Sequence, residues 1–82
     1  MNNLLRLPAV VKATGLARPT LYLRVRNGLF PRPVKLSERA SAWPENEVAE
    51  INAARIAGMP DTVIRAIVTR QHSQRTSDMG VS

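Results

Sequence analysis

The residues best suited to chemistry in this 82-residue chain are its basic side chains, and they are unevenly distributed. Twelve residues are Lys or Arg and six are Asp or Glu, which gives a net charge of +6. Six of the bases fall between Arg18 and Arg39, where Glu38 is the single acid. Clustered guanidinium and ammonium groups bind phosphate through charge and, for Arg, through paired hydrogen bonds. The spacing therefore indicates a polyanionic partner, with nucleic acid expected ahead of an anionic membrane surface.

Other kinds of chemistry have few residues to support them. The chain has no cysteine and one histidine, His72, which excludes disulfides, thiolate metal sites and His-based zinc or catalytic sets within one chain. Glu45, Glu47 and Glu50 fit the start of a helix, whose positive dipole end favours acids, and Glu47 is also expected to pair with an Arg near the hairpin described below. We expect no enzyme, no cofactor and no metal.

Apolar segments also limit where the protein acts. No run approaches the ~20 apolar residues that a membrane-spanning helix needs. Arg6 and Pro8 interrupt the apolar N-terminal stretch, which is not typical of a signal peptide. We therefore expect a cytoplasmic protein that makes no membrane contact.

Hydrophobic periodicity and the positions of Pro and Gly predict the elements that position the bases. Gly15 and Gly28 are expected to end the first two helices, and Pro31 and Pro33 exclude a helix from the segment that follows. The predicted order is an extended lead-in at 4–5, helices at about 7–14 and 18–27, a hairpin pairing 34–36 with 41–43, and helices from 44 to about 57 and from about 60 to 72. The expected fold is mainly α with a small β-hairpin, a helix-helix-wing-helix arrangement with an extra C-terminal helix. We expect one domain over 1–72, with its core at 4–57, and a flexible tail over 73–82.

The second predicted helix has two faces at 100° per residue. Leu21, Tyr22 and Val25 are expected to share the buried face, with the Tyr22 hydroxyl reaching outward. The opposite face is expected to carry Thr20, Leu23, Arg24 and Asn27. Such side chains suit the major groove, where Arg pairs with guanine, Asn with adenine, and an apolar group meets the thymine methyl.

Two further groups of apolar residues have structural interpretations. Phe30 and Trp43 are expected in the core, because a small domain with three aromatic residues needs them for packing. An apolar stripe on the last helix is expected either to pack within the chain or to form a dimer contact, and the residues leave both open. The stripe consists of Val63, Ile64, Ile67 and Val68.

Two sequence blocks occur in a specific order: TGLARPTLY over residues 14–22 and FPRPVKL over residues 30–36. LRLPAV precedes them at residues 5–10, and Trp43 and the pair Glu47-Val48 follow. In this order they resemble the AlpA-type phage and prophage regulatory proteins, over about residues 4–57. The resemblance implies a winged helix-turn-helix of the MerR and excisionase type, DNA binding, activation of prophage genes and, in some members, a role in excision. It also implies a bacterial or phage protein associated with the nucleoid.

The resemblance carries the family's recognition-helix and wing positions onto Arg18, Pro19 and Thr20, onto Tyr22, and onto Arg32, Lys35 and Arg39. Ala17 and Pro19 stand where the family has polar residues, so the second helix is expected to start without a good cap. Leu23 before Arg24 reverses the family's basic-then-apolar order, which leaves open which of the two faces the bases. The candidate DNA-binding residues are Arg18, Pro19, Thr20, Tyr22, Leu23, Arg24, Arg26, Asn27, Arg32, Lys35, Ser37 and Arg39.

Three functions follow from these residues. The leading hypothesis is a sequence-specific regulator of transcription that binds double-stranded DNA. The second is an excisionase-like architectural factor that bends DNA for site-specific recombination, and the third is a protein adaptor whose charge is incidental. The expected partners are double-stranded DNA, a second copy in a homodimer or a cooperative array on DNA, and RNA polymerase or a recombinase. The residues do not decide the operator, the target genes, activation against repression, or the oligomeric state.

Overall fold

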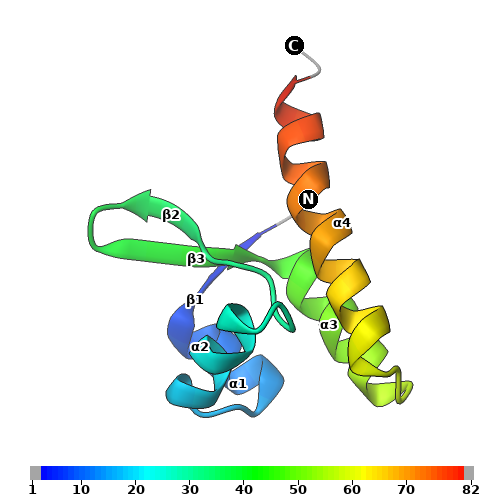
Figure 1. Cartoon of the computed structure of the whole chain (residues 1–82). Helices are drawn as coiled ribbons and strands as arrows, with labels where there is room; N and C mark the ends of the chain where they lie inside the picture. Colours follow the sequence, from blue (N-terminus) through cyan, green and yellow to red (C-terminus); the bar gives the residue numbers. More distant parts are fainter. Residues whose placement is uncertain (1–2, 81–82) are drawn as a thin grey trace.

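The computed structural model describes residues 3–80, with side chains through residue 76. Within this range the chain forms four helices and a three-stranded antiparallel sheet (Figure 1). The elements in chain order are β1 (Leu4–Arg6), α1 (Leu7–Thr14), α2 (Arg18–Arg26), β2 (Val34–Ser37), β3 (Ala40–Pro44), α3 (Glu45–Ile56) and α4 (Asp61–Gly80). The predicted fold class, a small winged helix-turn-helix with an added C-terminal helix, is confirmed.

The sheet has one more strand than the sequence pattern predicted. Its order is β1-β3-β2, so β3 is the central strand, and Leu5 of the predicted lead-in pairs with Trp43. The lead-in was missed as a strand because three residues are too few to show an alternating pattern, and only pairing with β3 stabilises them. Figure 1 shows the β2–β3 hairpin projecting away from the helices, as the wing of the fold.

The α1–α2 corner is set by local backbone chemistry. Gly15 adopts a left-handed conformation with φ of 72°, and its N–H donates to the Val11 carbonyl at 2.9 Å, which ends α1. Asn52 of α3 donates from Nδ2 to the Ala13 carbonyl at 3.0 Å, so α3 also caps this helix end. Ala17 makes no side-chain capping bond at the start of α2, as predicted.

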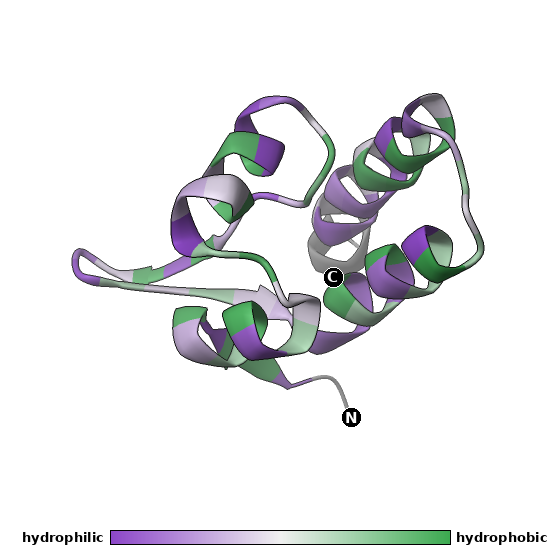
Figure 2. Ribbon diagram, turned by 90° about the horizontal axis from the view of Figure 1, so that it is seen from below, coloured by the Kyte–Doolittle hydropathy of each residue, from purple (hydrophilic) through white to green (hydrophobic). Residues whose placement is uncertain are grey.

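The hydrophobic core lies where the sheet, α1, α2, α3 and α4 converge. Trp43 and Phe30 are fully buried as predicted, with ring centroids 6.3 Å apart in an edge-to-face arrangement. The Trp43 indole N–H donates to the Pro31 carbonyl at 2.8 Å. Seen from below, hydrophobic and hydrophilic residues alternate along the helices, as expected for helices that bury one stripe each (Figure 2).

Helix α4 corrects the predicted end of the last helix and bears on the alternatives for its apolar stripe. It continues to Gly80 instead of ending near residue 72, so the predicted tail from 73 is helical through residue 80; residues 81–82 lie outside the described range. Of the two alternatives for its apolar stripe, the structure places Ile64 and Val68 in the chain's own core and packs Ile67 against it, while Val63 is exposed. Within the described range, no helix is long and apolar enough to cross a membrane.

Candidate nucleic-acid interface

The side chains that the sequence assigned to DNA binding are exposed on α2 and the wing segment, with one exception. The first turn of α2 is exposed. Ala17 enters the helix in an extended conformation, and Pro19 lies in the first turn, where no N–H donor is needed. Leu23 is 51% exposed, which is unusual for leucine in water. Of the twelve candidate residues, eleven are exposed and only Arg24 is not.

Arg24 was predicted on the outward face, and this prediction is wrong. Its side chain is half-buried and lines a cavity with Phe30 and Ile51, on the side of α2 that faces α3. The reason is its spacing: Arg24 follows the fully buried Leu21 by three residues, which places the two only about 60° apart around the helix. Of the two residues whose order is reversed relative to the family, Leu23 is therefore the exposed one and Arg24 the half-buried one.

Tyr22 was predicted on the buried face and instead lies at its edge. The side chain is 43% exposed, and its ring centroid is 6.3 Å from that of Trp43. Tyr22 lines a cleft of about 330 Å³ between the helices and the wing, together with Arg6, Arg39 and Ser41. Two Arg side chains and two hydroxyls suit a backbone phosphate. Sequence reasoning missed Arg6 and Ser41, and only the position of β1 beside β3 reveals them.

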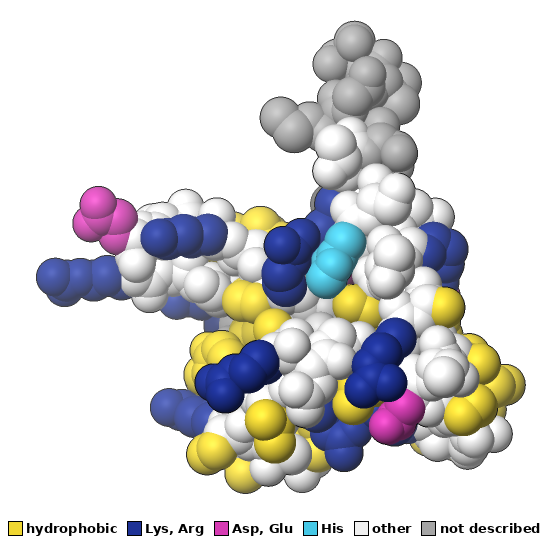
Figure 3. All heavy atoms as spheres, viewed as in Figure 1, with side chains coloured by type: hydrophobic (Ala, Val, Ile, Leu, Met, Phe, Trp, Pro, Cys, Tyr) yellow, Lys and Arg dark blue, Asp and Glu magenta, His cyan; other side chains and the backbone are white. Residues whose placement is uncertain are grey.

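The wing carries the remaining candidate bases. Lys35, Ser37 and Arg39 are exposed on the β2–β3 hairpin, and a register irregularity between Lys35 and Ser37 lies near the turn. Figure 3 shows basic side chains along this hairpin and across the helices below it, with one acidic side chain at the hairpin tip. The hairpin and α2 therefore present positive charge on one side of the molecule.

Of the acidic residues whose side chains the structure describes, Glu38 lies on the wing and the others lie on α3 and α4. The three ion pairs found among the described residues all involve bases of α3 and α4: Arg55 with Asp61, Arg70 with Glu50, and Arg75 with Glu47. Within the same part of the chain, none of the six bases between Arg18 and Arg39 forms an ion pair. The three ion pairs therefore compensate bases of α3 and α4, whereas the bases of α2 and the wing are balanced on their own side by Glu38 alone.

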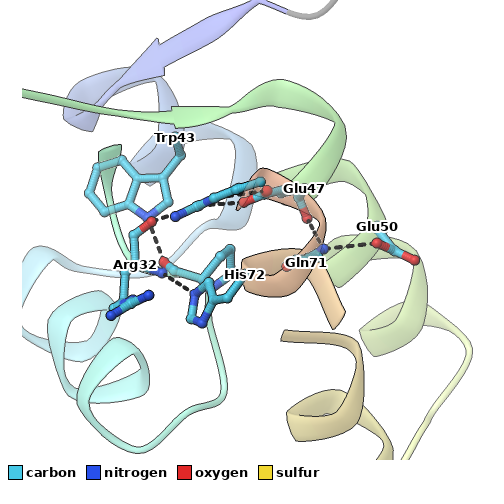
Figure 4. A network of polar contacts seen from close by, with 8 residues as sticks. Arg32, Trp43, Glu47, Glu50, Gln71 and His72 are labelled. Carbon is cyan, nitrogen blue, oxygen red and sulfur yellow. Dashed lines mark hydrogen bonds and ion pairs between the residues drawn. The ribbon is translucent and has the colours of Figure 1, made fainter. Parts of the chain in front are cut away.

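The segment that joins α2 to the wing is held by α4 (Figure 4). The Arg32 N–H donates to His72 Nε2 at 3.1 Å, and the Arg32 carbonyl accepts from Arg75 Nη2 at 2.8 Å. Arg75 also donates from Nε to Glu47 Oε2 at 3.0 Å. The predicted pairing of Glu47 with an Arg near the wing is therefore confirmed, and the partner is Arg75 of α4, which also contacts the segment just before β2. These bonds fix the backbone from which the exposed Arg32 side chain projects.

Gln71 completes this network. The four side chains of Glu47, Gln71, His72 and Arg75, which surround the Arg32 backbone, are called here the α4 clamp. Gln71 is buried and donates from Nε2 to the Glu47 carbonyl at 3.2 Å and to Glu50 Oε1 at 2.9 Å. Burial lowers the pKa of His72, and the positive charges of Arg32 and Arg75 lower it further. Both effects favour the neutral imidazole, whose Nε2 accepts the Arg32 N–H.

Comparison with known proteins now bears on this geometry. The family model described as "Prophage CP4-57 regulatory protein (AlpA)" matches residues 3–56. The chain belongs to the AlpA family. A relative is "Uncharacterized protein ORF88" of Enterobacteria phage P4, which is 44% identical over 54 residues, covering 66% of this chain and 61% of the relative. The chain thus spans less than two thirds of that relative's length. No solved structure matches the chain.

The AlpA match covers β1 through α3 and ends before α4 begins at Asp61. The candidate interface on α2 and the wing therefore lies inside the AlpA region. The α4 clamp combines Glu47, inside that region, with Gln71, His72 and Arg75 outside it. Membership in the family confirms the resemblance drawn from the sequence blocks, and it supports a phage-associated regulatory role.

Proposed function

We propose that this protein is a sequence-specific regulator that binds double-stranded DNA, with α2 in the major groove and the wing along the neighbouring backbone. The observation that carries the proposal is the separation of charge: the three ion pairs found among the described residues all join α3 and α4, and none involves a base of α2 or the wing. A helix-turn-helix places its second helix in the groove, and a basic surface beside it supplies phosphate contacts.

The exposed side chains of α2 and of the wing segment have two different roles under this proposal. Thr20, Leu23 and Asn27 face outward and suit base edges, through hydrogen bonds or contact with a thymine methyl. Five exposed bases suit phosphates and carry no sequence information themselves. These are Arg18, Arg26, Arg32, Lys35 and Arg39.

Salt dependence tests the phosphate contacts quantitatively. Neutralising about five phosphates gives a slope of log K against log salt of about −4.5. Affinity should then fall about 500-fold between 50 and 200 mM salt. Fluorescence anisotropy with duplexes selected from a random pool measures this slope, and absence of binding to any duplex at low salt would overturn the proposal.

Variants of the wing provide the matched comparison. Lys35→Gln and Arg39→Gln should each reduce the magnitude of the slope by about 0.9. Arg70→Gln removes the same charge from α4, away from the interface, and should leave the slope unchanged. Leu23→Ala should instead change which duplexes are selected, and a uniform loss of affinity across sequences would contradict its role in reading bases.

The selected sequences also distinguish modes of assembly. A palindrome with half-sites about one helical turn apart would indicate a two-fold dimer, whereas direct repeats would indicate head-to-tail loading. Action as an excision factor, and contacts with RNA polymerase or a recombinase, remain predictions of the sequence analysis.

A further inference from the structure

A second concave site lies away from the wing, between α2 and α3. Its volume is about 220 Å³, and its walls come from α1, the turn after it, α2, the loop after α2, and α3. Four wall residues are apolar: Leu16, Leu29, Phe30 and Ile51. The other four are polar or charged: Thr14, Arg24, Asn52 and Arg55. No acidic residue lines this cavity.

Each of the two arginines of this cavity has one donor nitrogen that makes no hydrogen bond within the described residues. Arg24 Nε and Arg55 Nη2 are buried and have no hydrogen-bond partner within the described part of the chain. Arg55 uses only Nη1, which pairs with Asp61 Oδ1 at 3.2 Å. A buried donor without a partner is costly, and more so on a charged group. Arg24 and Arg55 are also the only charged residues on the walls of this cavity among the described residues, so their guanidinium groups are the charged donors that it offers to an acceptor from outside the chain.

We propose that this cavity binds a small organic carboxylate with an apolar body. A carboxylate accepts paired, charge-assisted hydrogen bonds from guanidinium groups, which would satisfy Arg24 and Arg55 together. The apolar body would contact the side chains of Leu16, Phe30 and Ile51. A bare inorganic anion would satisfy the arginines and leave these apolar walls without contacts.

Size restricts the ligand further. A dry apolar cavity of roughly 150 Å³ holds a benzene ring, whereas drug-sized ligands occupy roughly 300 Å³ or more. At about 220 Å³, this cavity suits a single ring or a short branched chain with one carboxylate. Benzoate and 3-methylbutanoate are therefore suitable probes.

NMR titration of the full chain tests binding without DNA. Benzoate should give saturable shifts of the Leu16, Leu29 and Ile51 amides, with a dissociation constant of about 1 mM or tighter. Benzamide has nearly the same shape without the charge and should bind at least about tenfold more weakly. Inorganic phosphate should also bind at least about tenfold more weakly, because it lacks the apolar body. Equal affinity for benzamide or for phosphate, or no saturable shift with either carboxylate, would overturn the proposal.

Variants assign the binding to the two arginines. Arg24→Gln and Arg55→Gln should each weaken benzoate binding about tenfold or more. Lys12→Gln removes an exposed charge from α1, outside the cavity, and should leave the affinity unchanged. Arg24→Lys keeps the charge but lacks the Nε donor, so it should also bind weakly and serves if Arg24→Gln does not fold. Wild-type affinity in every folded arginine variant would refute the assignment.

Discussion

Replacing Arg75 with Gln should destabilise the protein much more than an equivalent change elsewhere on α4. Arg75 is the positive partner of Glu47 and also donates to the Arg32 carbonyl. The Glu47 side chain is only 9% exposed and that of Arg75 only 23% exposed, so the variant leaves a buried carboxylate without its compensating charge. Breaking a buried pair in this way costs roughly 3–5 kcal/mol, and the partial exposure of Arg75 reduces the expected cost to about 2–3 kcal/mol.

Urea unfolding followed by the fluorescence of Trp43 measures this cost, because Trp43 is the single tryptophan and is fully buried. With a slope of about 1 kcal/mol per molar urea, typical of a small domain, the midpoint should fall by about 2–3 M. Exchange of the Arg32 amide hydrogen, which is bonded to His72, should also accelerate as the segment loosens.

Arg70→Gln is the matched control on the same helix. Arg70 pairs with Glu50, but their side chains are 47% and 39% exposed, so the loss should be about 0.5 kcal/mol. The double variant Glu47→Gln/Arg75→Gln should cost less than the sum of its single changes, because no charge is then left buried. Equal midpoints for Arg75→Gln and Arg70→Gln would refute the reasoning that the buried carboxylate sets the cost.

The other predictions concern the same segment and its turns. Because the folded state lowers the pKa of His72, the unfolded chain takes up a proton first as pH falls below about 6.5, so stability should fall there. His72→Gln should remove this part of the pH dependence in urea midpoints at pH 7.5 and 5.5, and an unchanged dependence would contradict the assignment. Gly28→Ala should cost about 1–2 kcal/mol in a thermal melt, because its φ of 76° is strained for any residue with a side chain. Trp43→Phe removes the donor to the Pro31 carbonyl and should lower the urea midpoint by about 1–3 M, from a loss of about 1–3 kcal/mol; an unchanged midpoint would show that water replaces the bond.

The helices and turns that the sequence predicted correctly depend on residues that lie close together along the chain. Apolar spacing predicted α1 and α2, and Gly15 and Gly28, both with positive φ, end them as expected. The prolines at 31 and 33 correctly excluded a helix there. These features are local, because helix termination and proline geometry act within a few residues. The order of sequence blocks also identified the family.

Contacts between distant segments were decided only by the tertiary structure. The sequence of α2 did not reveal that α3 would pack on the side that carries Leu21 and Arg24, and the polar composition after residue 72 did not reveal that Arg75 would meet Glu47. Such pairings join residues far apart in the sequence, so periodicity in either segment carries no signal for them. The sequence alone thus determined which residues could meet a polyanion, through their type and clustering. The fold determined which of them are presented to it, because exposure depends on what the other helices cover.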